Sequence, residues 1–348
     1  MTITGTGRNA LRYALGITLA AAIAYAVAWQ MAWLTTVLTA TFLGNRGPRP
    51  SLQQTLFILA AMALIFAVGL GVTLSLYRYP GVLSLIVTLA LYLTFFYAAR
   101  GAPQLIVLLC VLAILVFPLI AGIASALVPA IAGSLLVSAA VALFCTQVAY
   151  TLVPGSPATR QAPPPAAALA NQHAMQSAWL SCAVILPAAL YSLWWNASDA
   201  ILPLVMVALL SVKPDFSTGA AGGKALVAAN LGGGLVALLF YQLLRMCPSY
   251  PFVLTGLFGL GLVFGQGLFS QRRIAPLYGT AFNTVLVLIG SGTGQYGAEA
   301  DAKFYERLLL ISLAACYVVG LLSLLQLPQL RERWMRAGTW LFDRLRPA

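Results

Sequence analysis

The sequence predicts an all-α polytopic membrane protein made of two parallel six-segment repeats, and three observations lead to this class. The 348 residues are 61% hydrophobic and 7% charged, whereas soluble domains carry about 25% charged residues. The apolar runs approach the roughly 20 residues that a membrane-crossing helix needs, and they lack the alternation of barrel strands. The same order of long spans, short spans and polar loops occurs twice along the chain.

Breaks rich in polar residues, glycine and proline divide the apolar sequence into twelve predicted segments. The first six cover residues 11–29, 31–44, 53–77, 81–99, 103–121 and 128–152, and the second six cover 177–196, 200–212, 220–246, 251–270, 274–290 and 305–327. Ten of them are expected to span fully. Segments 31–44 and 200–212 are too short for a hydrocarbon core of about 30 Å, so we expect broken or re-entrant helices there.

The first segment also fits a second interpretation. Arg8 and Arg12 precede an apolar stretch that ends in small residues at 24–28, as a cleaved signal peptide would. Because the apolar character resumes at once in segment 31–44, an uncleaved first helix is the better prediction.

Matching positions in the two halves support the repeat. Arg78 precedes Pro80 after the third segment, and Arg245 precedes Pro248 after the ninth. The loop at 44–51 corresponds to residues 213–217 and the glycines after them. The predicted domains are a first transmembrane repeat at 1–152, a Pro/Ala-rich cytoplasmic linker at 153–176, a second repeat at 177–328 and a cytoplasmic amphipathic tail at 329–348.

The basic residues predict the orientation. The net charge is +12, but the 19 Lys and Arg are scattered singly, so we expect loop charges and no nucleic-acid partner. With the N-terminus in the cytoplasm, only Arg78, Arg245, Lys303 and Arg307 face outward and the other fifteen face inward. Both termini are therefore expected in the cytoplasm.

The sequence is not expected to encode an enzyme, although one motif typical of nucleotide-binding enzymes occurs in it. Residues 292–297 fit GxGxxG, yet no strand or βαβ unit surrounds them. The five cysteines form no CxxC pair, and the chain has one histidine, so we expect no metal site, no cofactor and no catalytic residues. The absence of a Walker lysine motif argues against an ATP-driven pump.

The candidate binding residues lie in the loops beside the two short segments. Broken helices expose N–H groups and dipole ends, which suit an anion when cations are adjacent. Arg46 and Arg49 supply cations in one half, and Lys213 and Lys224 supply them in the other. The alternative is that these residues anchor the helix ends at the interface. Asp215 would pair with Lys213 or Lys224, or titrate during proton coupling.

Three further positions are candidates. Arg78 and Arg245 oppose the orientation rule at equivalent places, either by reaching the outer headgroups or by forming an exit site for anions. Asn230 precedes three glycines, and Gly261 and Gly265 form a GxxxG pair. Helix packing is favoured over pore lining for these positions.

These features resemble the fusaric-acid-resistance and aromatic-acid-exporter (FUSC) superfamily, particularly its compact bacterial members of the DUF2955 type. The resemblance lies in residues 11–16 (LRYALG), 33–40 (WLTTVLTA), 44–51 (GNRGPRPS), 213–217 (KPDFS), Lys224 and 230–234 (NLGGG). It implies efflux of aromatic or other organic acids through the bacterial inner membrane, with a periplasmic membrane-fusion adaptor and an outer-membrane channel as partners. Larger members carry a sizeable cytoplasmic domain that is absent between these halves.

Three functions are carried forward. The first is a secondary exporter of small organic anions, with aromatic carboxylates as the expected substrates. The second is a passive organic-anion channel, because plant malate channels are distantly similar. The third is a non-transporting membrane scaffold of an envelope assembly. The sequence leaves open whether the chain forms a homo-oligomer.

Overall fold

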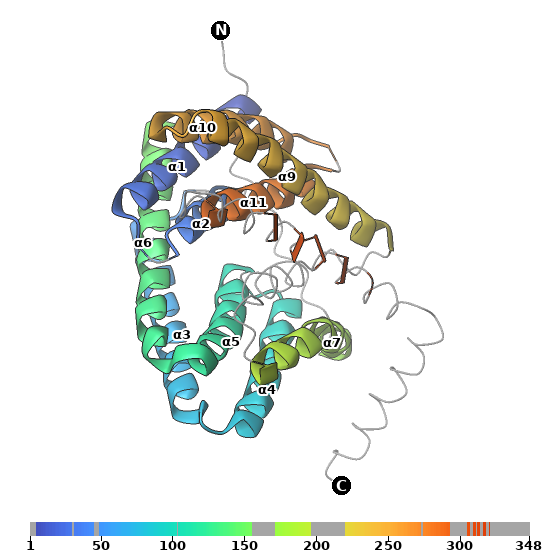
Figure 1. Cartoon of the computed structure of the whole chain (residues 1–348). Coiled ribbons are helices and arrows are strands. Elements are labelled where there is room, and N and C mark those ends of the chain that lie inside the picture. The colour runs from blue at the N-terminus through green and yellow to red at the C-terminus, as the bar shows by residue number, and fades with distance from the viewer. Residues whose placement is uncertain are drawn as a thin grey trace. The chain divides into compact units, whose positions relative to one another are not determined.

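The computed structural model is helical and contains no strand in the residues that it describes (Figure 1). It describes residues 5–29, 31–44, 49–102, 104–154, 171–195, 220–272 and 274–292, and helical positions 305–306, 309–310, 312–313, 316–317 and 320. The helices are α1 (Gly5–Val27), α2 (Trp33–Gly44), α3 (Leu52–Leu76), α4 (Pro80–Ala99), α5 (Gln104–Ala124), the short 3₁₀ helix η1 (Ser125–Leu127), α6 (Val128–Leu152), α7 (Asn171–Trp195), α9 (Ala220–Met246), α10 (Tyr250–Leu268) and α11 (Ala275–Gly292).

The helix boundaries agree with most of the predicted segments, and two starts differ. Helix α1 begins at residue 5 and not at 11, and α7 begins at 171 and not at 177, inside the predicted linker. In both cases the extra turns contain polar residues, which a hydropathy pattern excludes although they continue the helix. Helix α2 has 12 residues, about 18 Å, so the predicted short segment is confirmed. Segment 200–212, most of segment 305–327, residues 155–170 of the linker and the tail lie outside the described residues.

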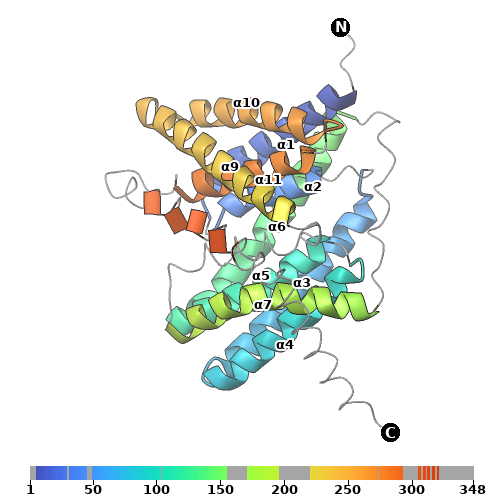
Figure 2. The same ribbon diagram turned by 90° about the vertical axis from the view of Figure 1, so that its right-hand side faces the viewer.

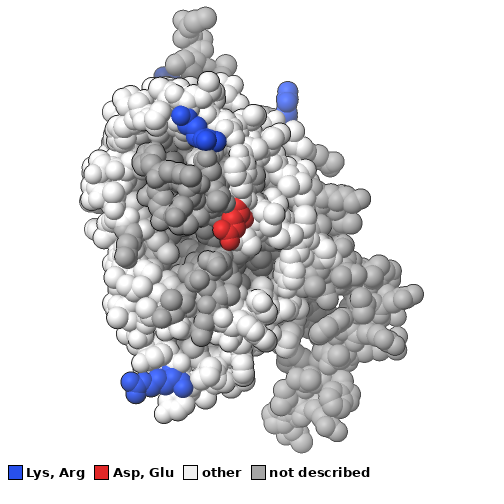
Figure 3. Space-filling model, in the orientation of Figure 1, with Lys and Arg blue, Asp and Glu red and all other residues white. Residues whose placement is uncertain are grey.

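Seven helices in the described part of the chain are long and apolar enough to cross a membrane. Helix α4 illustrates the lipid-compatible surface, because Leu85 is 71% exposed and Leu89 57% exposed on an apolar helix. Charged groups are few on the face in Figure 3, and uncharged surface separates them. The chain is therefore a multi-pass α-helical membrane protein.

The chain forms two compact units, each assembled from separate parts of the sequence. Unit 1 contains Met1–Val72, Ala124–Ala166 and Ala228–Ser312, and unit 2 contains Thr73–Ile123, Ala167–Val227 and Leu313–Ala348. Each unit therefore draws helices from both of the predicted halves.

Small residues bring α1 and α10 together in unit 1, where the two helices run side by side (Figures 1 and 2). A Cβ atom on Gly261 would lie 3.0 Å from Ala14 Cα, and one on Gly265 would lie 3.1 Å from Ala10 Cα. The GxxxG pair thus permits close helix approach, which confirms its predicted packing role. Helix α1 also packs on α2 and α6, and α2 packs on α6 and α11.

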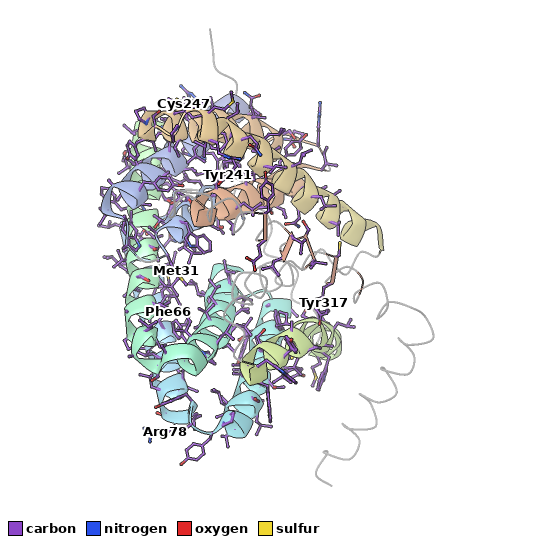
Figure 4. The ribbon with its side chains drawn as sticks, viewed as in Figure 1. Met31, Phe66, Arg78, Tyr241, Cys247 and Tyr317 are labelled. Carbon is purple, nitrogen blue, oxygen red and sulfur yellow. The ribbon has the colours of Figure 1, made fainter. Side chains whose placement is uncertain are left out.

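A tight reversal joins α1 to α2 and is tied to α6. Ala28 (φ 52°) and Met31 (φ 56°) adopt left-handed conformations that residues with a side chain seldom take. The Trp29 indole donates to Ser138 Oγ at 2.8 Å, and the Ser138 hydroxyl donates to Met31 O at 3.5 Å. Figure 4 shows Met31 beside α6. These bonds hold the reversal against its backbone strain.

Unit 2 is centred on the packing of α4 against α7. The buried side of α4 is a stripe of large apolar residues at four-residue spacing: Leu83, Val87, Leu91 and Phe95. The Tyr92 ring lies 5.3 Å from the Trp179 ring of α7, measured between centroids. The Tyr317 hydroxyl, labelled in Figure 4, donates to Val184 O at 3.1 Å.

The two principal packings occupy equivalent positions in the predicted repeat. In unit 1 the first helix of the first half, α1, packs on the fourth helix of the second half, α10. In unit 2 the first helix of the second half, α7, packs on the fourth helix of the first half, α4. Two similar halves that exchange their fourth helices would produce this pattern.

Candidate functional site

The structure describes the side chains of four of the predicted site residues, namely Arg49, Asn230, Arg78 and Arg245. Arg46, Lys213 and Asp215 lie outside the described residues. Lys224 belongs to the second turn of α9, and its side chain is not described. The predicted grouping of cations from both halves therefore stays a prediction.

Arg49 lies just before α3 and is held to α6 by one glutamine. The Arg49 Nε donates to Gln147 Oε1 at 3.0 Å. The Gln147 amide nitrogen donates in turn to Pro50 O at 2.9 Å and to Thr55 Oγ1 at 2.8 Å. Gln147 thus fixes the end of the predicted anion-binding loop against the last turns of α6.

The start of α3 is also fixed locally. The Gln54 N–H donates to Ser51 Oγ at 3.1 Å, and the Ser51 N–H donates to Gln54 Oε1 at 2.9 Å. This reciprocal pair is a capping box, which satisfies N–H groups that a helix start leaves without partners. It places the exposed Arg49 two residues before Ser51, the residue that caps the start of α3.

Arg78 and Arg245 are both exposed at helix ends. The Arg78 Nε donates to the hydroxyl of its neighbour Tyr77 at 3.2 Å, which raises the pKa of the Arg78 guanidinium. Arg78 lies at the turn between α3 and α4 (Figure 4). Arg245 lies in the last turn of α9, where a cation complements the helix dipole. Exposure suits both the headgroup and the exit-site predictions.

Asn230 is buried between α9 and α11. Its Oδ1 accepts a hydrogen bond from Thr284 Oγ1 at 2.7 Å, and the side chain is 4% exposed. A Cβ atom on Gly233 would collide with Ala281 O, so the helices approach closely one turn further along. These contacts give Asn230 a packing role.

Arg12 is the functional candidate that sequence reasoning missed. It is the eighth residue of α1 and is 3% exposed. Its Nη2 donates to Asn9 Oδ1 at 3.0 Å, and its guanidinium carbon lies 4.1 Å from the Tyr150 ring centroid. Its Nε has no hydrogen-bond partner among the described residues. A guanidinium carries five N–H donors, so this buried cation retains capacity for a ligand.

The sequence around Arg12 contains no acidic residue that could neutralise its charge. Residues 1–198 contain seven arginines and no Asp or Glu, and the first acid of the chain is Asp199. The helices α1, α2, α3 and α6 therefore supply no carboxylate. Buried charges are ordinarily paired, because isolating them from water is costly. This asymmetry, together with the helical position of Arg12, is the signal that could have identified it.

Arg12 and Arg49 are attached to neighbouring points on α6. Tyr150 contacts the first and Gln147 bonds the second. Residues three apart on a helix share a face, with about 5–6 Å between their Cβ atoms. One face of α6 therefore contacts a buried arginine and an exposed arginine through two residues that lie one turn apart. Such an arrangement is suited to binding an anion.

In the described part of the chain, no group of three His, Cys, Asp or Glu side chains is positioned to hold a metal ion. The five cysteines are free thiols.

Comparison with known proteins gives one match. A family model described as "Protein of unknown function (DUF2955)" matches residues 9–149. This stretch contains Arg12, Arg49 and Gln147 and covers most of the first predicted half. No curated protein and no solved structure matches the chain. The DUF2955 match is compatible with the resemblance to the FUSC superfamily and supplies no activity.

Proposed function

We propose that the protein is a secondary transporter that exports small organic anions across the bacterial inner membrane, with aromatic carboxylates as the expected substrates. One observation carries the proposal: Arg12 is buried in a membrane helix, its Nε has no partner among the described residues, and it belongs to a half of the sequence that contains no Asp or Glu. Ionisable residues inside membrane helices commonly mark ion or substrate pathways. A cation of this kind favours an anionic substrate.

The proposed membrane arrangement is two parallel six-segment repeats with both termini in the cytoplasm. The packing of α1 on α10 and of α7 on α4 supports the repeat. In unit 1, Arg8, Arg12 and Arg49 belong to the helix ends that the basic-residue bias assigns to the cytoplasm. A substrate would therefore meet the exposed Arg49 from the cytoplasmic side.

The outward direction and the protein partners rest on the resemblance to the FUSC superfamily. That resemblance implies a periplasmic membrane-fusion adaptor and an outer-membrane channel. The organic-anion channel remains the second candidate, because a buried arginine without a carboxylate partner among the described residues would also serve passive conduction.

Transport by the purified protein in liposomes tests the proposal. The probe is radiolabelled p-aminohippurate, an aromatic carboxylate whose polar amide limits passive leakage. Accumulation that requires an imposed pH gradient or membrane potential supports a coupled exporter, and equilibration without accumulation supports a channel. No movement above that in protein-free liposomes, with no effect of replacing Arg46, Arg49, Lys213 and Lys224 by alanine on any solute phenotype in cells, would favour the scaffold.

A further inference from the structure

We propose that Arg12 and Arg49 form a two-stage binding site for one carboxylate group of an organic acid with an apolar body. The exposed Arg49 captures the carboxylate, and the buried Arg12 holds it. This inference rests on the proposed function and names the substrate class and the residues of its binding site.

The positions of the two arginines give the order of binding. Arg49 is exposed, and Arg12 is 3% exposed. Their contacts on α6, Gln147 and Tyr150, lie one helical turn apart on the same face. An anion attracted from water meets Arg49 first, because opposite charges steer encounter. It then moves along α6 to a cation that water reaches poorly, where the attraction is stronger.

The Arg12 guanidinium keeps one buried hydrogen-bond donor that no described residue uses. The guanidinium carbon lies 4.1 Å from the centroid of the Tyr150 ring, which is a cation–π contact. The N–H donors point outward in the plane of the group, so the ring does not compete with a carboxylate. Asn9 occupies one hydrogen of Nη2, and the Nε hydrogen has no partner among the described residues. A carboxylate that reached Nε would satisfy a buried donor that is costly to leave without a partner.

The surroundings select the ligand class. Tyr150 contacts the Arg12 guanidinium, and its neighbour Ala149 on α6 is also buried and apolar. One buried guanidinium neutralises one carboxylate, whereas phosphate would bring additional charge into a poorly hydrated space. An apolar body on the acid would be buried favourably against these side chains. The geometry thus favours a monocarboxylate with a hydrocarbon or aromatic body.

Binding of radiolabelled benzoate to the purified full-length protein in detergent tests the site. Benzamide, the neutral isostere, and inorganic phosphate are the competitors. Arg12→Gln is compared with Arg8→Gln, because Arg8 is an exposed arginine one turn earlier on α1 and its replacement changes net charge equally. Arg12→Lys keeps the positive charge but removes the Nε donor. A folded Arg12→Lys protein that binds more weakly therefore shows a loss of binding without a loss of folding. Gel filtration verifies the folding of each variant.

We expect the wild type and Arg8→Gln to bind benzoate, unlabelled benzoate to compete, and benzamide and phosphate not to compete. Arg12→Gln should weaken binding about ten- to a hundredfold, as expected for loss of a charge-assisted hydrogen bond. Arg12→Lys should bind more weakly than wild type and more tightly than Arg12→Gln. Arg49→Gln should slow association, with a smaller effect at high salt.

Three results would overturn the site: no saturable benzoate binding by the wild type, wild-type affinity in folded Arg12→Gln, or equal weakening in Arg8→Gln. The proposed function fails separately. Benzoate binding that depends on Arg12, without transport in liposomes, would retain the site and reject the transporter. Transport by the wild type that is unchanged in Arg12→Gln would retain the transporter and reject the site.

Discussion

The guanidinium carbon of Arg12 lies 4.1 Å from the centroid of the Tyr150 ring, although 138 residues separate them in the chain. The contact joins the beginning of α1 to the end of α6 within unit 1. It gives a buried cation an aromatic surface in place of a carboxylate. The Arg12 Nε has no hydrogen-bond partner among the described residues, and these two features underlie the proposed anion site.

The close approach of α1 and α10 predicts that Gly261→Ala will destabilise the protein. The added methyl group would lie 3.0 Å from the Ala14 backbone, and overpacking of this kind costs about 1–3 kcal/mol. The midpoint of thermal unfolding in detergent should therefore fall. Gly259→Ala is the matched control on α10, because nothing lies within 4 Å of its new Cβ. Equal midpoints for the two variants would contradict the packing.

The α1–α2 reversal predicts a specific effect of Ser138→Ala. The change removes the acceptor of the Trp29 indole and should cost about 1 kcal/mol of stability. Ser134→Ala on the same helix is the control, because the Ser134 hydroxyl bonds only its own helix at Ile131 O. Thermal unfolding midpoints compare the two. A larger loss in the control would show that Ser138 does not stabilise the reversal.

The hydrogen bond between Asn230 and Thr284 predicts energetic coupling across α9 and α11. A double-mutant cycle with Asn230→Ala and Thr284→Val should give a coupling of about 0.6 kcal/mol, as is usual between membrane helices. Pairing Asn230→Ala with Thr255→Val should be additive, since the Thr255 hydroxyl bonds within α10. Additivity in the first cycle would argue against the pair. Unfolding in a mixed-detergent titration provides the free energies.

Cys247 provides a native probe of orientation. It is exposed between α9 and α10, at the end that we propose faces outward (Figure 4). A membrane-impermeant maleimide should label it in intact spheroplasts, and Cys247→Ser should abolish that labelling. Cys145 and Cys182 are buried and should stay unlabelled in either case. Labelling of Cys247 only after the membrane is disrupted would reverse the proposed orientation.

Hydropathy predicted the apolar helices because burial in lipid requires long apolar runs. It therefore located α3, α4, α6, α9 and α10 to within about two residues. It could not show that α1 packs on α10 and α7 on α4, because such pairing depends on which side chains meet across helices distant in sequence. The Gly261 and Gly265 spacing indicated a close contact without identifying its partner.

The site was predicted less completely for a related reason. The loop pattern identifies Arg49, whereas Arg12, the second residue of the predicted segment 11–29, is grouped with the topology-setting charges. The structure extends α1 back to Gly5, so that Arg12 is the eighth residue of the helix and is buried. Hydropathy follows the lipid-facing part of a helix and excludes polar turns, even where another helix buries them. The partners Asn9 and Tyr150 follow only from the folded arrangement.

The central claim is that Arg12 binds the transported anion, and uptake of p-aminohippurate by liposomes containing wild type, Arg12→Gln or Arg8→Gln tests it most directly. The account predicts uptake by wild type and Arg8→Gln that exceeds uptake by protein-free liposomes, and its loss in correctly folded Arg12→Gln. Undiminished uptake by Arg12→Gln, or none by the wild type, would contradict it.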